Sequence, residues 1–412
     1  MSGPHGLEAG KGIVVSPARD PVSYCSELQA VYLLCKELRG HGFHFHFITN
    51  EGGATKKLCQ LGEVEPLRGW RETAYSLREP PYEGLKATLK HLLKKEPCDF
   101  IWINHLELVP SVYKILRELG RTDMHERIVA HVHFLPTIGK HASDPYWHPV
   151  PIKKELCIRI AAGVQLAKAI IVPSPFALQH LDQIVEYAGY EDSINDLLDR
   201  AIVVPPPISA EEIARGIREG KCVINKKDGV TRLILSSRLR REYVGWLIEE
   251  IGRIARRIPI ELVITEPRRR GSAKSHINPF TQQCLDKVRR LPFVVWKPIP
   301  NRLDYYATIR WAIRIGIANI RRDTLWSMAA AEVMACGKPC VAPRTPGYEW
   351  FVPDELLYES RDEFSDIVVK LAVDEALRLK LGRKAREKIM KKAEVKIVAK
   401  EFRQRVKRRL NF

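Results

Sequence analysis

The sequence lacks the long apolar segments that a membrane-spanning or exported protein needs. It has no run of about 18 apolar residues without charge, and its start, MSGPHGLEAGKG, contains no apolar signal core. Of the 412 residues, 45% are hydrophobic and 28% are charged, which is typical of a globular protein and excludes disorder and collagen. We therefore expect a cytoplasmic protein with two or three domains of about 150 residues each.

The sequence also lacks the spacing of a metal site. Its nine cysteines include no Cys-x-x-Cys pair and none beside histidines at zinc spacing. They are expected to be reduced and mostly buried. Asn and Gln are scarce, with eight of each, while Lys, Arg and Glu are abundant. This bias favours a thermophile, in which intracellular disulfides also occur.

Common phosphate, dinucleotide and hydrolase motifs are missing. There is no G-x-x-x-x-G-K-[ST] loop, no G-x-G-x-x-G after a strand and no G-x-S-x-G elbow. No Asp-x-Asp occurs, so a metal–diphosphate site of that type has no support. We therefore expect neither a cofactor nor a metal ion.

Positive charge is concentrated at the C-terminus. The formal net charge is +18, and residues 378–412 contain 15 Lys and Arg but three acids, which is about two thirds of the excess. Such a segment is either a solvated basic helix or a surface for the phosphates of nucleic acid, anionic lipid or a phosphorylated substrate. Phe402, Val406 and Leu410 recur every four residues, which gives the last helix an apolar stripe for docking.

Short apolar runs alternate with amphipathic stretches along the chain, as in a parallel α/β fold. Pro205–Pro207 ends the first series of runs and a second begins at Arg232. The pattern predicts two doubly wound domains facing across a cleft, at residues 1–208 and 209–385, and a basic helical tail at 386–412. The expected strands are 12–16, 43–49, 99–105, 127–134, 169–174, 201–207, 232–237, 260–265, 293–299, 313–319 and 338–343.

The segment RRDTLWSMAAAEVMACGKPCVAP, residues 321–343, is the most informative. It predicts a small-residue helix that Gly337 and Pro339 end, followed by a strand. The amides at the start of that helix can receive an anion or sugar hydroxyls. Glu332 lies about two turns into the helix, and its carboxylate is suited to accept hydrogen bonds from the two hydroxyls of a ribose. The structural alternative is a packed helix in which Glu332 forms a salt bridge.

This segment resembles the C-terminal domain of GT-B glycosyltransferases of the large retaining family 4. That family carries Glu-x7-Glu followed by Met-Ala-x-Gly-x-Pro, and EVMACGKP, beginning at Glu332, matches the second half. TPGYEWFV (345–352) is similar to the family's next element, and LILSSRL (233–239) to its Gly-Arg-Leu strand end. The resemblance implies a GT-B fold of two Rossmann-like domains, in which the tail at 386–412 packs back on the first domain. It also implies a retaining, metal-independent hexosyltransferase that uses a nucleotide sugar.

The sequence departs from the family at three places. The first glutamate of the motif falls at Thr324, with Asp323 one residue away. The usual lysine position after Gly-Arg-Leu is near Tyr243 or Val244, and RDPVSYCSE (19–27) replaces the N-terminal Gly-Gly loop. The chain is therefore either a divergent subfamily with its own donor or a protein that has lost activity.

Carried over residue by residue, the resemblance implies a donor site in the second half of the chain. Arg238 would pair with the donor diphosphate, Arg240 or Arg241 would replace the lysine, and Glu332 would bind the ribose. The donor sugar would contact Asp323 or Thr324 and the amides of Trp326 and Ser327, and the backbone of Trp296–Ile299 would line the base pocket.

In the first half, AHVHFLP (130–136) resembles the strand end whose histidine lies beside the reacting sugar. His133 is the better match and His131 the alternative, while His105 ends another strand and could face the same cleft. A histidine there can bond the sugar or stabilise developing charge. No carboxylate stands out as a nucleophile.

Three hypotheses follow for the partners. In the first, the acceptor is a glycan or lipid-linked sugar, and the basic tail holds the enzyme at the anionic inner face of the membrane. In the second, the acceptor is tRNA or another nucleic acid, which the tail and residues 268–270 would contact. In the third, the chain is a non-catalytic GT-B-like binding protein.

Overall fold

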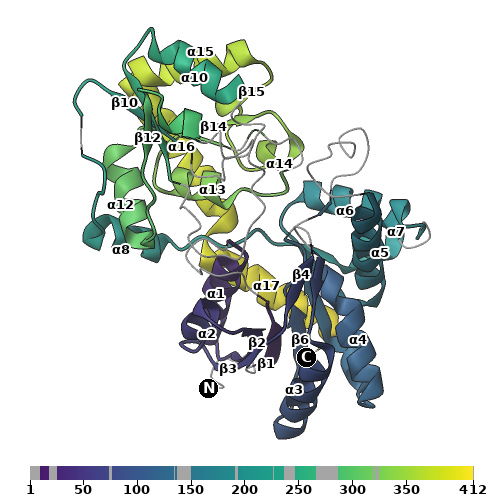
Figure 1. Cartoon of the computed structure of the whole chain (residues 1–412). Coiled ribbons are helices and arrows are strands. Elements are labelled where there is room, and N and C mark those ends of the chain that lie inside the picture. Colours follow the sequence, from purple (N-terminus) through teal and green to yellow (C-terminus); the bar gives the residue numbers. More distant parts are fainter. Residues whose placement is uncertain are drawn as a thin grey trace, which may run out of the picture. The chain divides into compact units, whose positions relative to one another are not determined.

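The computed structural model describes residues 10–17, 26–73, 77–133, 135–136, 150–190, 194–225, 227–235, 246–265, 286–318, 320 and 324–411. The chain forms two compact units, Met1–Pro207 with Val395–Phe412, and Ile208–Glu394. We call them unit 1 and unit 2. Each contains its own parallel sheet with helices packed around it, as Figure 1 shows. None of the helices in the described part of the chain has the length and hydropathy that crossing a membrane requires.

The sheet of unit 1 has seven parallel strands in the order β3-β2-β1-β6-β7-β8-β9. The strand order reverses between β1 and β6, which are neighbours in register. The central strands are buried along almost their whole length, as expected for strands covered on both faces. The strands are β1 (Lys11–Val15), β2 (His44–Asn50), β3 (Glu63–Leu67), β6 (Phe100–Ile103), β7 (Ile128–His131), β8 (Ala169–Val172) and β9 (Ala201–Val203).

The other elements of unit 1 connect these strands. A short antiparallel hairpin pairs β4 (Arg71–Thr73) with β5 (Leu77–Glu79). Ser174 caps α6, because its side chain accepts a hydrogen bond from the Ala177 amide. The helices are α1 (Ser26–Arg39), α2 (Gly53–Leu58), α3 (Tyr82–Lys95), α4 (Val109–Glu118), α5 (Val150–Leu166), α6 (Pro175–Tyr187) and α7 (Ile194–Arg200), with 3-10 turns η3 (Leu106–Leu108) and η4 (Thr122–Arg127).

The sheet of unit 2 has six parallel strands in the order β12-β11-β10-β13-β14-β15, with the reversal between β10 and β13. These strands are β10 (Thr231–Leu235), β11 (Ile260–Ile264), β12 (Val294–Trp296), β13 (Ile315–Ile317), β14 (Cys340–Pro343) and β15 (Leu357–Tyr358). The helices are α8 (Ala210–Glu219), α10 (Trp246–Ala255), α12 (Arg302–Ala312), α13 (Met328–Ala335), α14 (Pro346–Glu349), α15 (Arg361–Val373) and α16 (Glu375–Ala393), with the 3-10 turn η7 (Asp354–Leu356).

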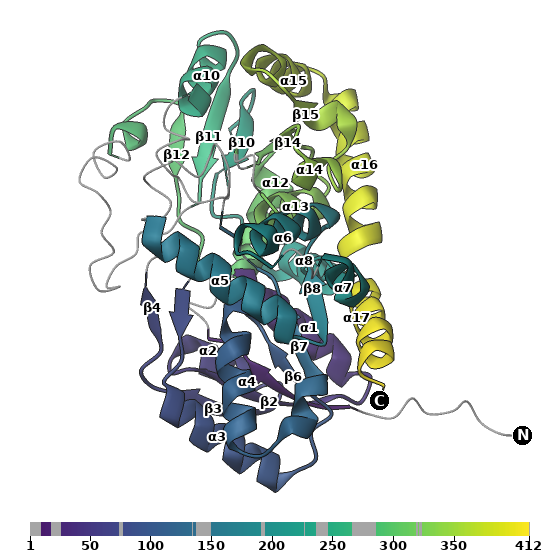
Figure 2. The same ribbon diagram turned by 90° about the vertical axis from the view of Figure 1, so that its right-hand side faces the viewer.

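The last helix, α17 (Val395–Leu410), belongs to unit 1 although unit 2 precedes it. It packs beside α1, as Figures 1 and 2 both show. Its apolar stripe lies in the core of unit 1, where the Phe402 ring is 5.1 Å from that of Trp102. Where the chain enters and leaves unit 2, the Ile208 amide donates to the Ala393 carbonyl at 2.7 Å.

The two parallel α/β sheets confirm the fold class that the sequence indicated. All eleven predicted strands overlap observed ones. The predicted strands did not include β3, β4, β5 and β15. The edge strand β3 has the polar sequence EVEPL, and the other three have only two or three residues each. The proposed tail boundary at residue 385 falls inside α16, so residues 386–394 remain in unit 2. The reason is that α16 continues to Ala393 as one regular helix.

Candidate functional site

Polar side chains of unit 1 gather where parallel strands end. Ser16 follows β1, Asn104 follows β6, His131 is the last residue of β7 and His133 comes two residues later. Strands β1 and β6 are the neighbours at which the strand order reverses. Ligands of doubly wound sheets bind outside the carboxyl ends of the strands at such a reversal.

A chain of hydrogen bonds joins three of these residues. Asn104 Nδ2 donates to Ser16 Oγ at 3.0 Å, and His133 Nε2 lies 2.6 Å from Asn104 Oδ1. Because an amide oxygen only accepts, this contact requires a proton on His133 Nε2. The Ser16 amide donates to the Ile48 carbonyl, and the Thr49 hydroxyl donates to the Ser16 carbonyl. These two bonds fix Ser16 at the end of the hydrogen-bonded series.

The other two predicted histidines lie beside His133. The His131 ring is 4.1 Å and the His105 ring 5.5 Å from it, between centroids. His131 is 2% exposed, stacks on Trp102 at 6.0 Å, and has no hydrogen-bond partner for either ring nitrogen among the described residues. Burial, and then the neighbouring His133, lowers the pKa of His131 well below its usual value. His131 is therefore neutral at physiological pH.

His105 is equally buried but has an acidic neighbour. Its side chain is 2% exposed, and its Nε2 lies 3.6 Å from Glu27 Oε2 at the start of α1. The structure thus brings His105, His131 and His133 together, as their positions at strand ends suggested. Sequence analysis missed Asn104 and Ser16, for which the available signal was a polar residue directly after an apolar strand.

In unit 2, helix α13 follows β13 and a polar loop. Ser327 caps the helix, since its Oγ accepts from the Ala330 amide at 3.3 Å. Gly337 follows the helix at φ 79°, a left-handed conformation in which a glycine has no steric cost. The Ser327 hydroxyl thus accepts a hydrogen bond in capping the helix, and the predicted contact of the Ser327 backbone with a donor sugar stays a prediction.

Glu332 is 5% exposed and lies in a buried polar cluster. It forms an ion pair with Arg302, the first residue of α12, and accepts a hydrogen bond from Tyr306 Oη at 3.2 Å. Arg302 Nε also donates to Tyr306 Oη at 2.9 Å. Burial raises the pKa of Tyr306 to about 12, so this phenol stays protonated. The salt bridge of the structural alternative is thus present, and the ribose contact of Glu332 stays a prediction.

The aromatic donor-site candidates are held by neighbours in unit 2. The Trp326 ring lies 4.5 Å from that of Phe351 and 5.8 Å from that of Trp350. Trp296 ends β12 with the Arg289 guanidinium 4.1 Å above its ring, while Thr324 and Ile299 are 8% and 5% exposed. Four candidates lie outside the described residues: Asp323, Arg238, Arg240 and Arg241.

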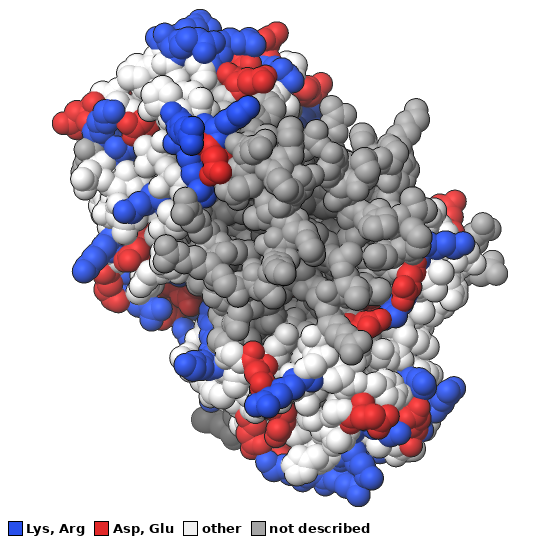
Figure 3. Space-filling view, viewed as in Figure 1, with Lys and Arg blue, Asp and Glu red and all other residues white. Residues whose placement is uncertain are grey.

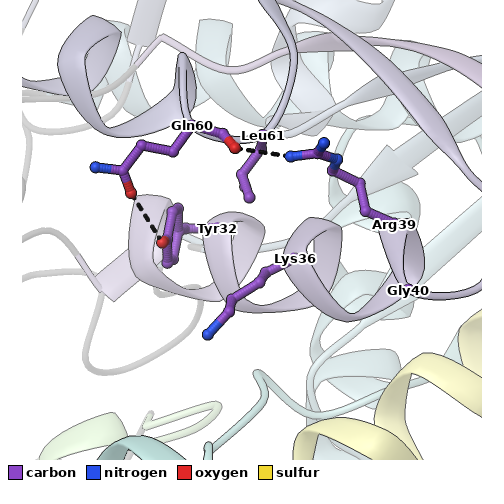
Figure 4. A pocket seen from close by; sticks show the side chains of 6 residues that line it. All are labelled: Tyr32, Lys36, Arg39, Gly40, Gln60 and Leu61. Atoms are coloured by element: carbon purple, nitrogen blue, oxygen red, sulfur yellow. Dashed lines mark hydrogen bonds between the residues drawn. The ribbon is translucent and has the colours of Figure 1, made fainter.

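A separate hollow of about 460 Å³ lies in unit 1, between α1 and the turn before β3. Figure 4 shows Tyr32 bonded to the Gln60 side chain and Arg39 bonded to the Gln60 carbonyl, at 3.2 and 2.7 Å. Lys36 and Arg39 belong to the last turn of α1, where cations complement the helix dipole. The hollow contains none of the predicted site residues; its lining is Tyr32, Lys36, Arg39, Gly40, Gln60 and Leu61.

Comparison with known proteins places the chain among glycosyltransferase-like folds. Residues 274–404 match the family model described as Glycosyl transferase-like. No curated protein matches the chain in sequence. Among solved structures, a glycosyltransferase from Rickettsia africae is 12% identical, with 98% of this chain and 99% of that chain covered and a TM-score of 0.68.

Two further structures agree over nearly the whole chain. Sucrose-phosphate synthase from Thermosynechococcus elongatus is 16% identical, covers 96% of this chain and 98% of its own, and has a TM-score of 0.66. Anabaena HepE in complex with UDP-glucose is 15% identical with the same coverage and a TM-score of 0.65. These findings confirm the resemblance: the chain has the GT-B fold, and its residues 274–404 are glycosyl transferase-like.

Proposed function

We propose that the chain is a glycosyltransferase that moves a sugar from a nucleotide sugar to an acceptor. The match of residues 274–404 to the Glycosyl transferase-like family carries this proposal, because that region contains Glu332 and helix α13. The GT-B fold supports it, and one neighbour of that fold, HepE, is described in complex with UDP-glucose. Hexose as the transferred sugar is part of the proposal.

In this proposal unit 2 binds the donor. Arg238, aided by Arg240 or Arg241, meets the diphosphate, and Glu332 binds the ribose. Asp323 or Thr324 and the backbone of Trp326 and Ser327 hold the sugar. The ion pair with Arg302 keeps the Glu332 carboxylate ionised and fixes its direction, so that it can accept from a ribose diol. The amides that begin α13 add partial positive charge for an oxygen-rich group.

Unit 1 supplies the histidine that contacts the reacting sugar. The bond from its Nε2 proton to Asn104 orients the His133 ring, and in this proposal that ring contacts a hydroxyl of the reacting sugar. We propose that the reaction retains anomeric configuration and needs no metal, so that arginine and helix amides stabilise the leaving nucleoside diphosphate. Assays in EDTA and with added Mg²⁺ test the second point, and NMR of the product anomer tests the first.

Donor binding is the decisive experiment. We expect one of UDP-, GDP- or ADP-sugar to raise the unfolding temperature of the wild type in EDTA, and Arg238→Ala to abolish that shift. Glu332→Gln keeps the shape of the side chain and should weaken the shift, measured against its own unliganded midpoint. Slow release of sugar would show catalysis. If no donor shifts the wild type, the proposal fails and the non-catalytic binding protein takes its place.

Helix α17 is the part of unit 1 that we propose to meet an anionic membrane carrying a lipid-linked acceptor. Its apolar stripe is buried, while Lys396, Lys400, Arg405, Arg408 and Arg409 are exposed. Its acid, Glu401, pairs with Arg405 at 2.8 Å. On the face drawn in Figure 3, by contrast, basic and acidic side chains of the described residues are interspersed.

Sedimentation with anionic and neutral vesicles tests this role. We expect binding to anionic vesicles that falls with salt, and loss of it in Lys396→Gln with Lys400→Gln. Salt-dependent binding to tRNA, without vesicle binding, would instead support the nucleic-acid acceptor. Localisation at the inner membrane face depends on the first outcome.

A further inference from the structure

Unit 2 has a second group of charged residues at the edge opposite the candidate donor site. Lys338 lies in the turn between α13 and β14, and Arg314 directly precedes β13. Strands β13 and β14 are parallel neighbours in which Gly316 pairs with Cys340. Arg314 lies two residues before Gly316, and Lys338 lies two residues before Cys340. The register therefore places these two cations side by side at a strand spacing of about 4.8 Å.

Two helices add cations at the same turn. Gly382 of α16 packs on the turn so closely that a Cβ there would lie 2.4 Å from the Gly337 carbonyl oxygen. Arg378 and Arg386 stand four residues before and after Gly382, on the same helix face. From α12, the Arg310 guanidinium lies 3.6 Å from the position that a Cβ on Gly337 would take.

We call Arg310, Arg314, Lys338, Arg378 and Arg386 the Lys338 cluster. Arg378 has a carboxylate neighbour, Glu375 at 3.5 Å, and donates to the Leu371 carbonyl. None of the other four forms an ion pair with a carboxylate of the described residues. Burial, and then the charges of Arg310 and Arg314, lowers the pKa of Lys338 to about 8. The cluster therefore holds five like charges together, and among the described residues only Arg378 is paired with a carboxylate.

We propose that the Lys338 cluster binds a phosphate group at the amino edge of the unit 2 sheet, away from the donor site. Four of these cations have no carboxylate partner among the described residues. Their positive charge matches the negative charge of a diphosphate. Guanidinium forks bind such oxygens in bidentate geometry, and the Lys338 ammonium adds a point charge. Gly382 packs against the turn around Gly337, so the residues of the cluster stand on elements that are packed tightly together.

Titration of the full chain with sodium diphosphate, at constant ionic strength and with chloride as the reference anion, tests the proposal. Arg386→Gln should weaken diphosphate binding about tenfold, which corresponds to about 1.4 kcal/mol, because one charge-assisted contact is lost. Lys338→Gln with Arg314→Gln should abolish it. Lys380→Gln is the matched control, because Lys380 is exposed on the opposite face of α16 and its loss should leave the affinity unchanged.

A second arm separates the source of the phosphate. Vesicles of phosphatidylcholine with phosphatidic acid replace diphosphate in the same series, and loss of binding in Arg386→Gln assigns the contact to the cluster. The donor site is controlled with Arg238→Ala, which should leave diphosphate affinity at the cluster unchanged. The proposal is overturned if the wild type binds neither probe. It is equally overturned if Arg238→Ala abolishes binding while Arg386→Gln does not.

Discussion

The two units hold their buried titratable groups in opposite ways. In unit 1, His131 is neutral, and the amide of Asn104 accepts the Nε2 proton of His133. In unit 2, Glu332 is paired with Arg302 and bonded to Tyr306. Burying a charge is costly unless an opposite charge and hydrogen bonds accompany it, whereas a neutral ring needs neither. The comparison indicates that unit 1 buries an uncharged histidine, whereas unit 2 buries a carboxylate that an ion pair holds in place.

Breaking the ion pair of unit 2 should have the largest effect. Glu332→Gln leaves the Arg302 guanidinium, 23% exposed, without its counter-charge, and we expect a loss of about 3 kcal/mol in unfolding free energy. Urea denaturation measures it. Glu349→Gln is the control, since Glu349 is 43% exposed and 3.9 Å from Arg344, and should cost under about 0.5 kcal/mol. Equal losses in the two variants would show that the buried pair contributes nothing special.

Removing the candidate catalytic histidine of unit 1 should lower activity and not stability. If the proposed function holds, His133→Ala should lower kcat about a hundredfold while leaving donor binding intact. Asn104→Ala removes the bond that orients the His133 ring and should lower kcat about tenfold. Asn104→Asp should shift the pH profile of kcat to higher pH, because a carboxylate stabilises the protonated imidazole. His44→Ala, an exposed histidine of β2, is the control. An unchanged profile in Asn104→Asp would refute the positioning role.

The third prediction concerns how stability depends on pH through His131, the buried neutral group of unit 1. Because the pKa of His131 is lowered in the folded state, the unfolded chain binds one more proton below about pH 6.5. Stability contributed by the neutral ring is complete above that pH and falls as pH decreases, by about 2 kcal/mol between pH 7 and 5. His131→Phe should reduce this fall in chemical denaturation curves at the two pH values. His44→Phe should leave it unchanged.

The smallest effect is expected where a charge in unit 2 has no partner. Lys338→Met removes an ammonium whose pKa is lowered to about 8, and we expect a gain of about 1–2 kcal/mol at pH 7. The gain should shrink between pH 8 and 10, because the folded wild type then loses its proton before the unfolded chain does. Lys380→Met, exposed on α16, should not change stability. Destabilisation by Lys338→Met would mean that an opposite charge compensates Lys338.

Several parts of the site could be foreseen from local pattern. Ser327 before an alanine-rich run and Gly337 after it mark the two ends of α13 to within a residue. The histidines 105, 131 and 133 stood at the ends of apolar runs, and parallel strands end at one edge of a sheet. Arg302 and Tyr306 could not be assigned to Glu332, because no spacing rule links positions 302 and 332 in different helices.

The sequence by itself determined the α/β class, because continuous apolar runs such as FIWI and AIIV can be buried only as strands covered on both faces. Caps and glycine stops are equally local, since each depends on hydrogen bonds within a few residues. Tertiary structure alone decided that His133 meets Asn104 and that Arg314 lies beside Lys338. These contacts follow from strand order and register, which depend on how distant segments pack and not on the residues adjacent in the chain.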